Sequence, residues 1–364
     1  MTRARSILLT ALLALIPATG CSLPAPDISH PPASVSPTPA APTPTPTPTP
    51  SPLPPSEPFT VSRLAITSVT PNSGTYGVGM PVIVTFSTDV PHRDRAALEN
   101  LFTVTSTSAI PAAAWSWTTA RTVTLRPRTF WPANTTITVR TRIAHHNLIN
   151  TARKHLTRLS GGTTTTLRFL HAVITRIDAT TKQAVVYRDG TPVRHMATSL
   201  GKPGWETRSG IKIVHEKYPV RRMTSQAVGD TTQQYDLQVP YAVRLTFSGE
   251  FAHGAPWATS RLGRVNGSHG CTNLSVPDAR WFYTHTRMGD PVITRHTGRP
   301  MEPGNGWGGP WNVHWDVWLT QSATGAHAYG PPPPALDPTR PTSLLPTELA
   351  PAEYPAAAPI APTG

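Results

Sequence analysis

The residues best suited to chemistry in this sequence surround Cys271. They form the run Ser-His-Gly-Cys-Thr-Asn over residues 268–273, and fourteen residues separate this run from His253. A cysteine thiolate is a strong nucleophile, and a neighbouring imidazole can accept the thiol proton. Glycine lets the backbone approach a substrate closely, and N–H groups around His269, Gly270 and Cys271 would stabilise an oxyanion. The pattern predicts a thiol acyl-transfer site.

Two other interpretations of Cys271 stay open at this point. The only other cysteine, Cys21, lies near the N-terminus, so Cys271 has no evident disulfide partner. A buried structural cysteine is common in folded proteins. His253, His269 and Cys271 could also bind zinc, although no second Cys-x-x-Cys pair or acidic partner accompanies them. The residues alone therefore allow a nucleophile, a core cysteine or a metal ligand.

A helix is expected directly after the cysteine run. Ser275 suits the N-cap position, and a proline and an acidic residue follow it in the first turn. The pattern continues to about Met288, and Gly289 then ends it. The positive end of this helix would lie one short turn beyond Cys271 and would favour the thiolate.

Spacing and residue types together resemble the active-site signature of the L,D-transpeptidase (YkuD-type) family, here His253 followed by Ser268-His269-Gly270-Cys271-x-Asn273. The resemblance extends from about residue 59 to residue 320. It implies that Cys271 is the nucleophile and that His253 acts as general base and then as general acid. It adds His269 to the catalytic set, and it assigns the turn and the oxyanion site to Ser268, Gly270 and Asn273. It implies neither a metal nor a cofactor.

The resemblance also assigns a lid over the acyl-donor pocket to residues 223–240, a polar stretch with no clear helix or strand pattern. Tyr235 would contribute its hydroxyl to the oxyanion hole, or else pack as an ordinary aromatic residue of the lid. Met223, at the start of the lid, and Trp257, shortly after His253, are expected at the substrate-binding site.

Three positions depart from the family pattern. Gly254 stands where several relatives carry serine, and its backbone carbonyl could still orient the imidazole of His253. Thr272 replaces an apolar residue after the cysteine. The early motif is Thr-Arg-Ser-Gly at residues 207–210, where many members have Thr-Pro-x-Gly. The nucleophile and the base are retained.

The N-terminus reads as an export signal. A basic start is followed by an apolar run, residues 7–16, that is too short to span a bilayer. It ends in Ala18-Thr-Gly-Cys21, which resembles a bacterial lipobox, so Cys21 is expected to be lipidated after removal of residues 1–20. The chain would then be exported and lipid-anchored on the outer face of the cytoplasmic membrane. An ordinary secretory signal is the alternative.

The remaining chain divides by composition. Residues 21–58 are rich in proline and threonine and predict an extended tether, and an exported location argues against an SH3-type ligand there. Residues 59–169 contain short Val/Thr/Ile-rich segments at regular spacing, which favour an antiparallel immunoglobulin-like sandwich. Its tryptophans are expected in the core, with glycan binding as the alternative; they are Trp115, Trp117 and Trp131.

The second half is expected to be β-rich as well, giving a mainly β protein. The catalytic domain would cover residues 170–298, with a short helix after the active-site cysteine. Residues 299–320 form a Trp-rich C-terminal subdomain in which Trp311, Trp315 and Trp318 fit one helical face that packs across the two domains, with a glycan platform as the alternative. Residues 321–364 are rich in proline and alanine and are expected to be disordered.

The formal net charge is +13. A basic exported protein can associate with anionic lipid or wall polymer. Nucleic acid is the competing partner, but no nucleic-acid-binding motif is present and the arginines are scattered, so none is expected.

The resemblance implies a peptidoglycan L,D-transpeptidase that forms third-to-third cross-links, with roles in cell-wall biogenesis and cell shape. The donor would be a stem tetrapeptide, the acceptor the side-chain amine of diaminopimelate, and carbapenem β-lactams would acylate Cys271. A wall-peptide cysteine carboxypeptidase or endopeptidase uses similar chemistry. A non-catalytic wall-binding module is the third alternative.

Overall fold

The computed structural model describes residues 58–229, 231 and 234–330. The signal segment, Cys21, nearly all of the tether and residues 331–364 lie outside the described residues. Within these ranges, the helices are all too short or too polar to cross a membrane.

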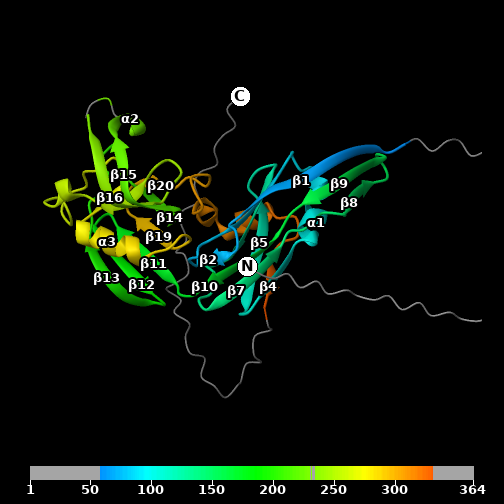
Figure 1. Ribbon diagram of the computed structural model, residues 1–364, viewed down its shortest axis with the longest axis horizontal. Coiled ribbons are helices and arrows are strands. Elements are labelled where there is room, and N and C mark those ends of the chain that lie inside the picture. Colours follow the sequence, from blue (N-terminus) through cyan, green and yellow to red (C-terminus); the bar gives the residue numbers. More distant parts are fainter. Residues whose placement is uncertain (1–57, 230, 232–233, 331–364) are drawn as a thin grey trace, which may run out of the picture. The chain divides into compact units, whose positions relative to one another are not determined.

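The first half of the described chain is a sandwich of two sheets that share one core (Figure 1). The larger sheet has the order β21 (His327–Tyr329), β5 (Ile110–Trp117), β6 (Thr122–Pro127), β3 (Val82–Phe86), β1 (Thr60–Thr70), β9 (His155–Gly161) and β8 (Asn147–Asn150). The smaller sheet has the order β2 (Gly74–Thr75), β10 (Thr164–Phe169), β7 (Thr135–Arg140) and β4 (Thr103–Ser106). The predicted immunoglobulin-like fold is confirmed. Two strand pairs are nevertheless parallel, β1 with β9 and β2 with β10.

Alternating burial explains the sandwich. Every second residue of β3 is buried, as expected for a strand that turns one face to a core. Trp115, Trp117 and Trp131 are almost fully buried, and the indole of Trp131 donates to the Met80 carbonyl at 2.7 Å. These tryptophans are therefore core residues and offer no surface for a glycan.

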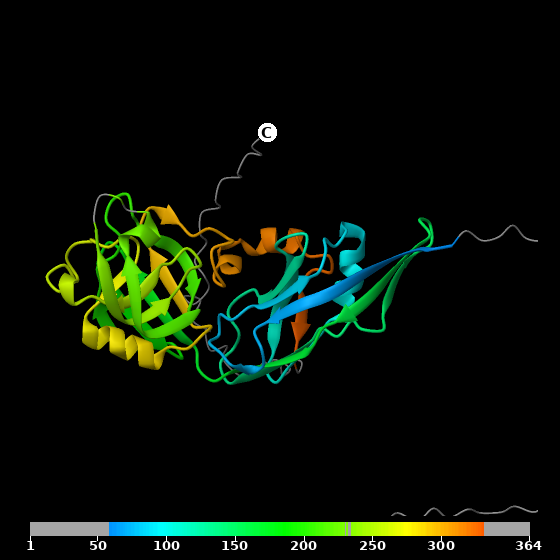
Figure 2. The same cartoon turned by 45° about the horizontal axis from the view of Figure 1, so that its top comes forward.

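The second half contains two further sheets. One has the order β13 (Thr191–Ala197), β12 (Gln183–Arg188), β11 (Val173–Asp178), β19 (Pro291–Arg295), β14 (Arg208–Ile213) and β20 (Arg299–Pro300). The other has the order β15 (Glu216–Thr224), β16 (Asp236–Arg244), β17 (Phe251–Gly254) and β18 (Thr272–Leu274). Helix α3 (Val276–His285) packs against β16 and β17, and Figure 2 shows it alongside these strands. The second sheet and α3 position the site.

Three expectations about local structure are wrong. The stretch 223–240 is not irregular, because β15 and β16 pair as a hairpin as far as Thr224 and Asp236, with α2 (Ser225–Val228) after β15. Helix α1 (His92–Leu101) lies within the sandwich, where only strands were expected. Helix α3 ends at His285 rather than near Met288, since Thr286 has an extended backbone and caps the helix with its own N–H.

The tryptophans near the C-terminus do not share one helix. Trp311 lies in the 3-10 helix η2 (Gly309–Asn312), whereas Trp315 and Trp318 lie in α4 (Trp315–Thr320). All three rings pack around the buried guanidinium of Arg126 from β6, with distances of 4.6 to 5.2 Å between Cζ and the ring centroids. Burial lowers the pKa of Arg126 to about 9. The Trp-rich segment thus packs on the sandwich, and Trp311 also shares a core with Ile211 and Ile213 of the second half, so it packs across the two domains as expected. Trp311 and Trp318 are buried and are not available for a glycan.

The tail is ordered further than predicted. Disorder was expected from residue 321, but β21 joins the larger sandwich sheet beside β5. The buried Glu99 carboxylate accepts hydrogen bonds from the backbone N–H groups of Ala323 (3.0 Å) and Thr324 (2.9 Å) and from the Trp117 indole (2.7 Å). A buried carboxylate needs such donors, so residues 322–324 are held in place.

Candidate active site

Strand pairing brings the nucleophile and the base together. Strands β17 and β18 are parallel neighbours, and His253 lies opposite Asn273 in their register. Cys271 directly precedes β18, at the end of the turn 268–271. The pairing of β17 with β18 therefore brings His253 close to the turn that carries Cys271, although the two residues are separated in the sequence.

Ser268 holds the turn closed. Its hydroxyl donates to the Cys271 carbonyl at 2.6 Å and accepts from the Gly270 N–H at 3.1 Å. The backbone of Gly270 has φ +109°, which a side chain would strain. Because the Gly270 N–H is already bonded to Ser268, the Cys271 N–H is the better oxyanion donor of the two in this structure.

His253 is buried, with 3% of its surface exposed, and its Nδ1 lies 3.0 Å from the Gly254 carbonyl oxygen. Burial lowers the pKa of His253 to about 4. The ring is neutral near pH 7, so Nδ1 carries the hydrogen that donates to Gly254 and Nε2 is left to accept a proton. The Gly254 carbonyl thus orients the imidazole in the way proposed from the sequence.

The thiol is also uncharged at rest. Cys271 keeps some exposure as a whole residue, but protein atoms surround its sulfur and raise the pKa to about 12. Its Sγ lies 3.9 Å from the Gly249 carbonyl oxygen, and among the described contacts no hydrogen bond joins it to the His253 ring. Desolvation outweighs the two effects that lower this pKa, a backbone hydrogen bond from Phe251 and the charge of Lys212. The structure thus favours a neutral resting thiol over the expected thiolate. Proton transfer to His253 must accompany attack.

His269 lies between two aromatic rings. The centroid of Trp205 is 5.0 Å from the imidazole centroid, edge to face, and that of Tyr235 is 5.3 Å away on a tilted ring. Trp205 was not singled out from the sequence. It lies two residues before the early family motif at residues 207–210, and that position is the signal that would have identified it.

The other expected site residues flank this centre. Met223 lies in β15 opposite Leu237 of β16. Tyr235 directly precedes β16 in the same hairpin. Trp257 in η1 (Pro256–Ala258) is 44% exposed, and its ring centroid lies 6.0 Å from that of His253. Asn273 is buried and pairs with Ser199 through backbone hydrogen bonds.

The helix after the site begins where predicted. The Ser275 hydroxyl accepts from the Asp278 N–H at 3.1 Å, which confirms the N-cap. The carboxylate of Asp278 pairs with Arg194 at 2.6 Å. The cap fixes α3 immediately after β18 and so restrains the strand that follows Cys271.

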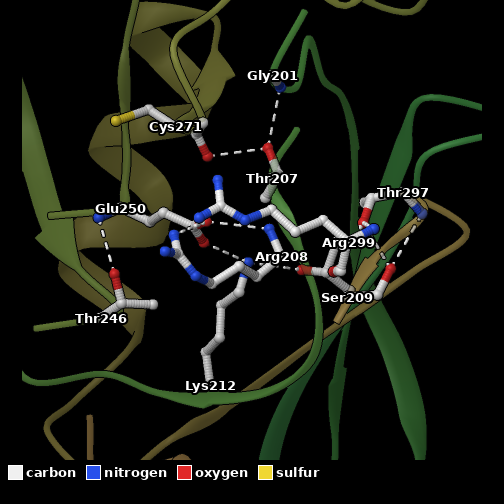
Figure 3. Close-up of polar contacts among 12 residues, drawn as sticks. Gly201, Thr207, Arg208, Ser209, Lys212, Thr246, Glu250, Cys271, Thr297 and Arg299 are labelled. Atoms are coloured by element: carbon white, nitrogen blue, oxygen red, sulfur yellow. Dashed lines mark hydrogen bonds and ion pairs between the residues drawn. The ribbon is translucent and has the colours of Figure 1, made fainter. Parts of the chain in front are cut away.

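A cluster of buried charges that was not predicted from the sequence lies beside the turn (Figure 3). Glu250 forms ion pairs with Lys212 and with Arg208, and all three side chains are largely or completely buried.

A cavity of about 320 Å³ opens next to Gly201 and Thr207. Among the described residues, no three His, Cys, Asp or Glu side chains converge as a metal-ligand set, so the zinc alternative for Cys271 has no supporting geometry.

Comparison with known proteins agrees with this geometry. Residues 58–147 match the bacterial Ig domain family, and residues 172–294 match the L,D-transpeptidase catalytic domain family, YkuD. L,D-transpeptidase 2 of Mycobacterium tuberculosis is 33% identical over 269 residues, which cover 72% of this chain and 63% of that protein. This chain therefore matches less than two thirds of that relative.

Two further similarities cover more of the other protein. L,D-transpeptidase 1 of M. tuberculosis is 32% identical over 244 residues, which cover 66% of this chain and 87% of that one. A solved structure of an L,D-transpeptidase in complex with imipenem is 30% identical with a TM-score of 0.52, and the match covers 64% of this chain and 99% of that chain. The resemblance seen in the sequence is confirmed, and the chain belongs to the L,D-transpeptidase family of acyltransferases.

Proposed function

We propose that this protein is a peptidoglycan L,D-transpeptidase that forms third-to-third cross-links between stem peptides through a thioester on Cys271. The observation that carries the proposal is the arrangement of the base. The neutral His253 ring is fixed by the Gly254 carbonyl at 3.0 Å, on the strand next to the one that follows the cysteine. This arrangement suits proton transfer from a thiol during attack.

The first step acylates the enzyme. His253 Nε2 takes the proton from the Cys271 thiol as Sγ attacks the carbonyl carbon of the third stem residue, diaminopimelate. The Cys271 N–H, with the Tyr235 hydroxyl, stabilises the oxyanion that forms. His253 then gives the proton to the amine of the terminal D-alanine, which leaves as the thioester forms.

The second step transfers the acyl group. The side-chain amine of a diaminopimelate on a neighbouring stem attacks the thioester carbonyl and loses a proton to His253. The carbon–sulfur bond breaks, and the sulfur recovers the proton. An amide cross-link and the free thiol remain. Ser268, Gly270 and Asn273 keep the turn in place, and His269 braces the lid residue Tyr235 against Trp205.

The relative solved with imipenem supports a β-lactam as a second acyl donor. A carbapenem would acylate Cys271 by opening of its lactam ring, with the lactam nitrogen taking the proton from His253. The lipobox-like Ala18-Thr-Gly-Cys21 supports export and a lipid anchor on the outer face of the cytoplasmic membrane, where the enzyme would act in cell-wall biogenesis and cell shape.

Mass spectrometry of a disaccharide-tetrapeptide incubated with residues 22–364 tests the reaction, with Cys271→Ala as the control. The proposal predicts a dimer that has lost one D-alanine and that is absent from the control. Tripeptide without dimer would mean a carboxypeptidase that uses water. Binding of the substrate without any product would mean a non-catalytic wall-binding module.

A further inference from the structure

The buried ionic cluster beside the catalytic turn consists of Arg208, Lys212 and Glu250. Glu250 as a residue is 4% exposed, and Lys212 is not exposed at all. One carboxylate oxygen lies 2.7 Å from Lys212 Nζ. The other accepts from the backbone N–H of Arg208 at 3.0 Å and from its guanidinium at 2.9 Å. Burying three charges costs desolvation free energy, which suggests that the cluster has a role beyond packing.

Thr207 connects this cluster to the nucleophile (Figure 3). Glu250 fixes the N–H of Arg208, which is the next residue after Thr207. The Thr207 hydroxyl, 1% exposed as a residue, donates to the Gly270 carbonyl at 2.8 Å and accepts from the Gly201 N–H at 2.9 Å. The Gly270 carbonyl belongs to the peptide unit that links Gly270 to Cys271.

A planar trans peptide carries its C=O and its N–H on opposite sides. Because Thr207 holds the Gly270 carbonyl, the Cys271 N–H must point away from Thr207. Ser268 fixes the following carbonyl, that of Cys271, at 2.6 Å. Both peptide units around the nucleophile are thereby fixed, and the direction of the proposed oxyanion donor depends on Thr207.

The same cluster also affects the charge on the sulfur. The Glu250 carboxylate lies 3.9 Å from the position that a Cβ on Gly270, the residue before Cys271, would occupy. There Glu250 raises the pKa of the Cys271 thiol, and Lys212, 2.7 Å from the carboxylate, lowers it. The two effects oppose one another as long as the pair is intact. Loss of Glu250 would leave the buried Lys212 cation without its partner, and loss of Lys212 would leave the carboxylate with Arg208 as its one remaining cation in the cluster.

We propose that Thr207 and the Lys212–Glu250 pair are positioning residues for Cys271. Thr207, held through Arg208 by Glu250, aims the Cys271 N–H at the oxyanion, and Lys212 balances the carboxylate beside the thiol. The role of Thr207 rests on the proposed acyl-transfer function. The role of the Lys212–Glu250 pair does not, because the charge on the thiol can be measured without any acyl donor.

Thr207→Val tests the aim of the oxyanion donor, with Thr207→Ser as the matched control that keeps the hydroxyl. Acylation by imipenem forms an oxyanion, whereas alkylation by iodoacetamide does not. We expect the valine variant to be acylated about tenfold or more slowly, with alkylation within about twofold of wild type. The serine variant should recover acylation. Equal losses in both reactions, or no loss in acylation, would overturn this role of Thr207.

Single and double variants of the ion pair test the charge balance through the iodoacetamide rate at pH 8. We expect Lys212→Met to react about tenfold more slowly and Glu250→Gln about tenfold faster, because a nearby charge shifts a thiol pKa by about one unit or more. The double variant should lie near wild type. Changes in the same direction in both single variants would contradict the charge balance and indicate a packing role.

The double variant Lys212→Met/Glu250→Gln has no charge at either position, so it replaces a single variant that fails to fold. An iodoacetamide rate near that of wild type supports the charge balance, and a tenfold change in either direction overturns it. Wild-type protein that is alkylated but never acylated by imipenem would refute the proposed function and leave the charge test valid.

Discussion

At the scale of single residues, the site is a neutral pair. Burial lowers the pKa of His253 to about 4 and raises that of Cys271 to about 12. Between these values the imidazole can accept a proton and the thiol still has one to give. The reactive form of the pair is therefore the dominant form across the physiological range.

This pair predicts a specific pH dependence. Protonation of His253 removes the base, so acylation by imipenem should fall as the pH drops toward about 4 and should be level from roughly pH 6 to 9. Alkylation by iodoacetamide needs the thiolate and should rise about tenfold per pH unit through pH 9. A plateau in the alkylation rate between pH 5 and 8 would instead show a resting thiolate–imidazolium pair.

Removal of the base gives a second prediction at this scale. His253→Gln keeps a side chain of similar reach but cannot accept the thiol proton. Acylation by imipenem at pH 7 should fall by a factor of about 10² to 10⁴. Stopped-flow measurement of lactam-ring absorbance checks this. A rate within a fewfold of wild type would assign the base to another residue.

At the scale of elements, the helix cap restrains the strand behind the nucleophile. Ser275→Ala removes the acceptor for the Asp278 N–H and should lower the free energy of unfolding by about 1 kcal/mol. Thermal or urea unfolding checks this, with Ser275→Asp as the control that keeps a capping oxygen. Unchanged stability would mean that the Arg194–Asp278 pair alone holds the start of α3.

The elements that position the site were predictable to different degrees. The turn, its glycine and the Ser275 cap follow from local sequence, because each depends on residues within a few positions. The hairpin β15–β16 was missed, because its residues pair across the lid and are mostly exposed on β15. Glu250, Lys212 and Arg208 were also missed, because a charged residue can be recognised as buried only when its partner, distant in the sequence, is known.

At the scale of the whole molecule, the C-terminal segment belongs to the sandwich. Its composition suggested disorder, but Glu99, more than 200 residues away, is satisfied by Ala323 and Thr324. Ending the chain after Gln321 would leave this buried carboxylate short of donors. The free energy of unfolding should fall by roughly 2 kcal/mol.

Urea unfolding of the truncated chain checks this prediction, and a chain ending after Gly330 is the matched control. The control retains β21 and should match the full chain in stability. Equal stability of both truncations would show that water replaces the lost donors at Glu99.

The central claim is that acyl transfer passes through a thioester on Cys271 with His253 as the base. Intact-protein mass spectrometry after incubation with imipenem tests it most directly, with Cys271→Ala and His253→Gln measured in parallel. The account predicts one adduct with the mass of imipenem on wild type, localised to Cys271 by peptide mapping. It predicts no adduct on the alanine variant and slow formation on the glutamine variant. An adduct that persists in Cys271→Ala, or an unmodified wild-type protein whose thiol still reacts with iodoacetamide, would contradict it.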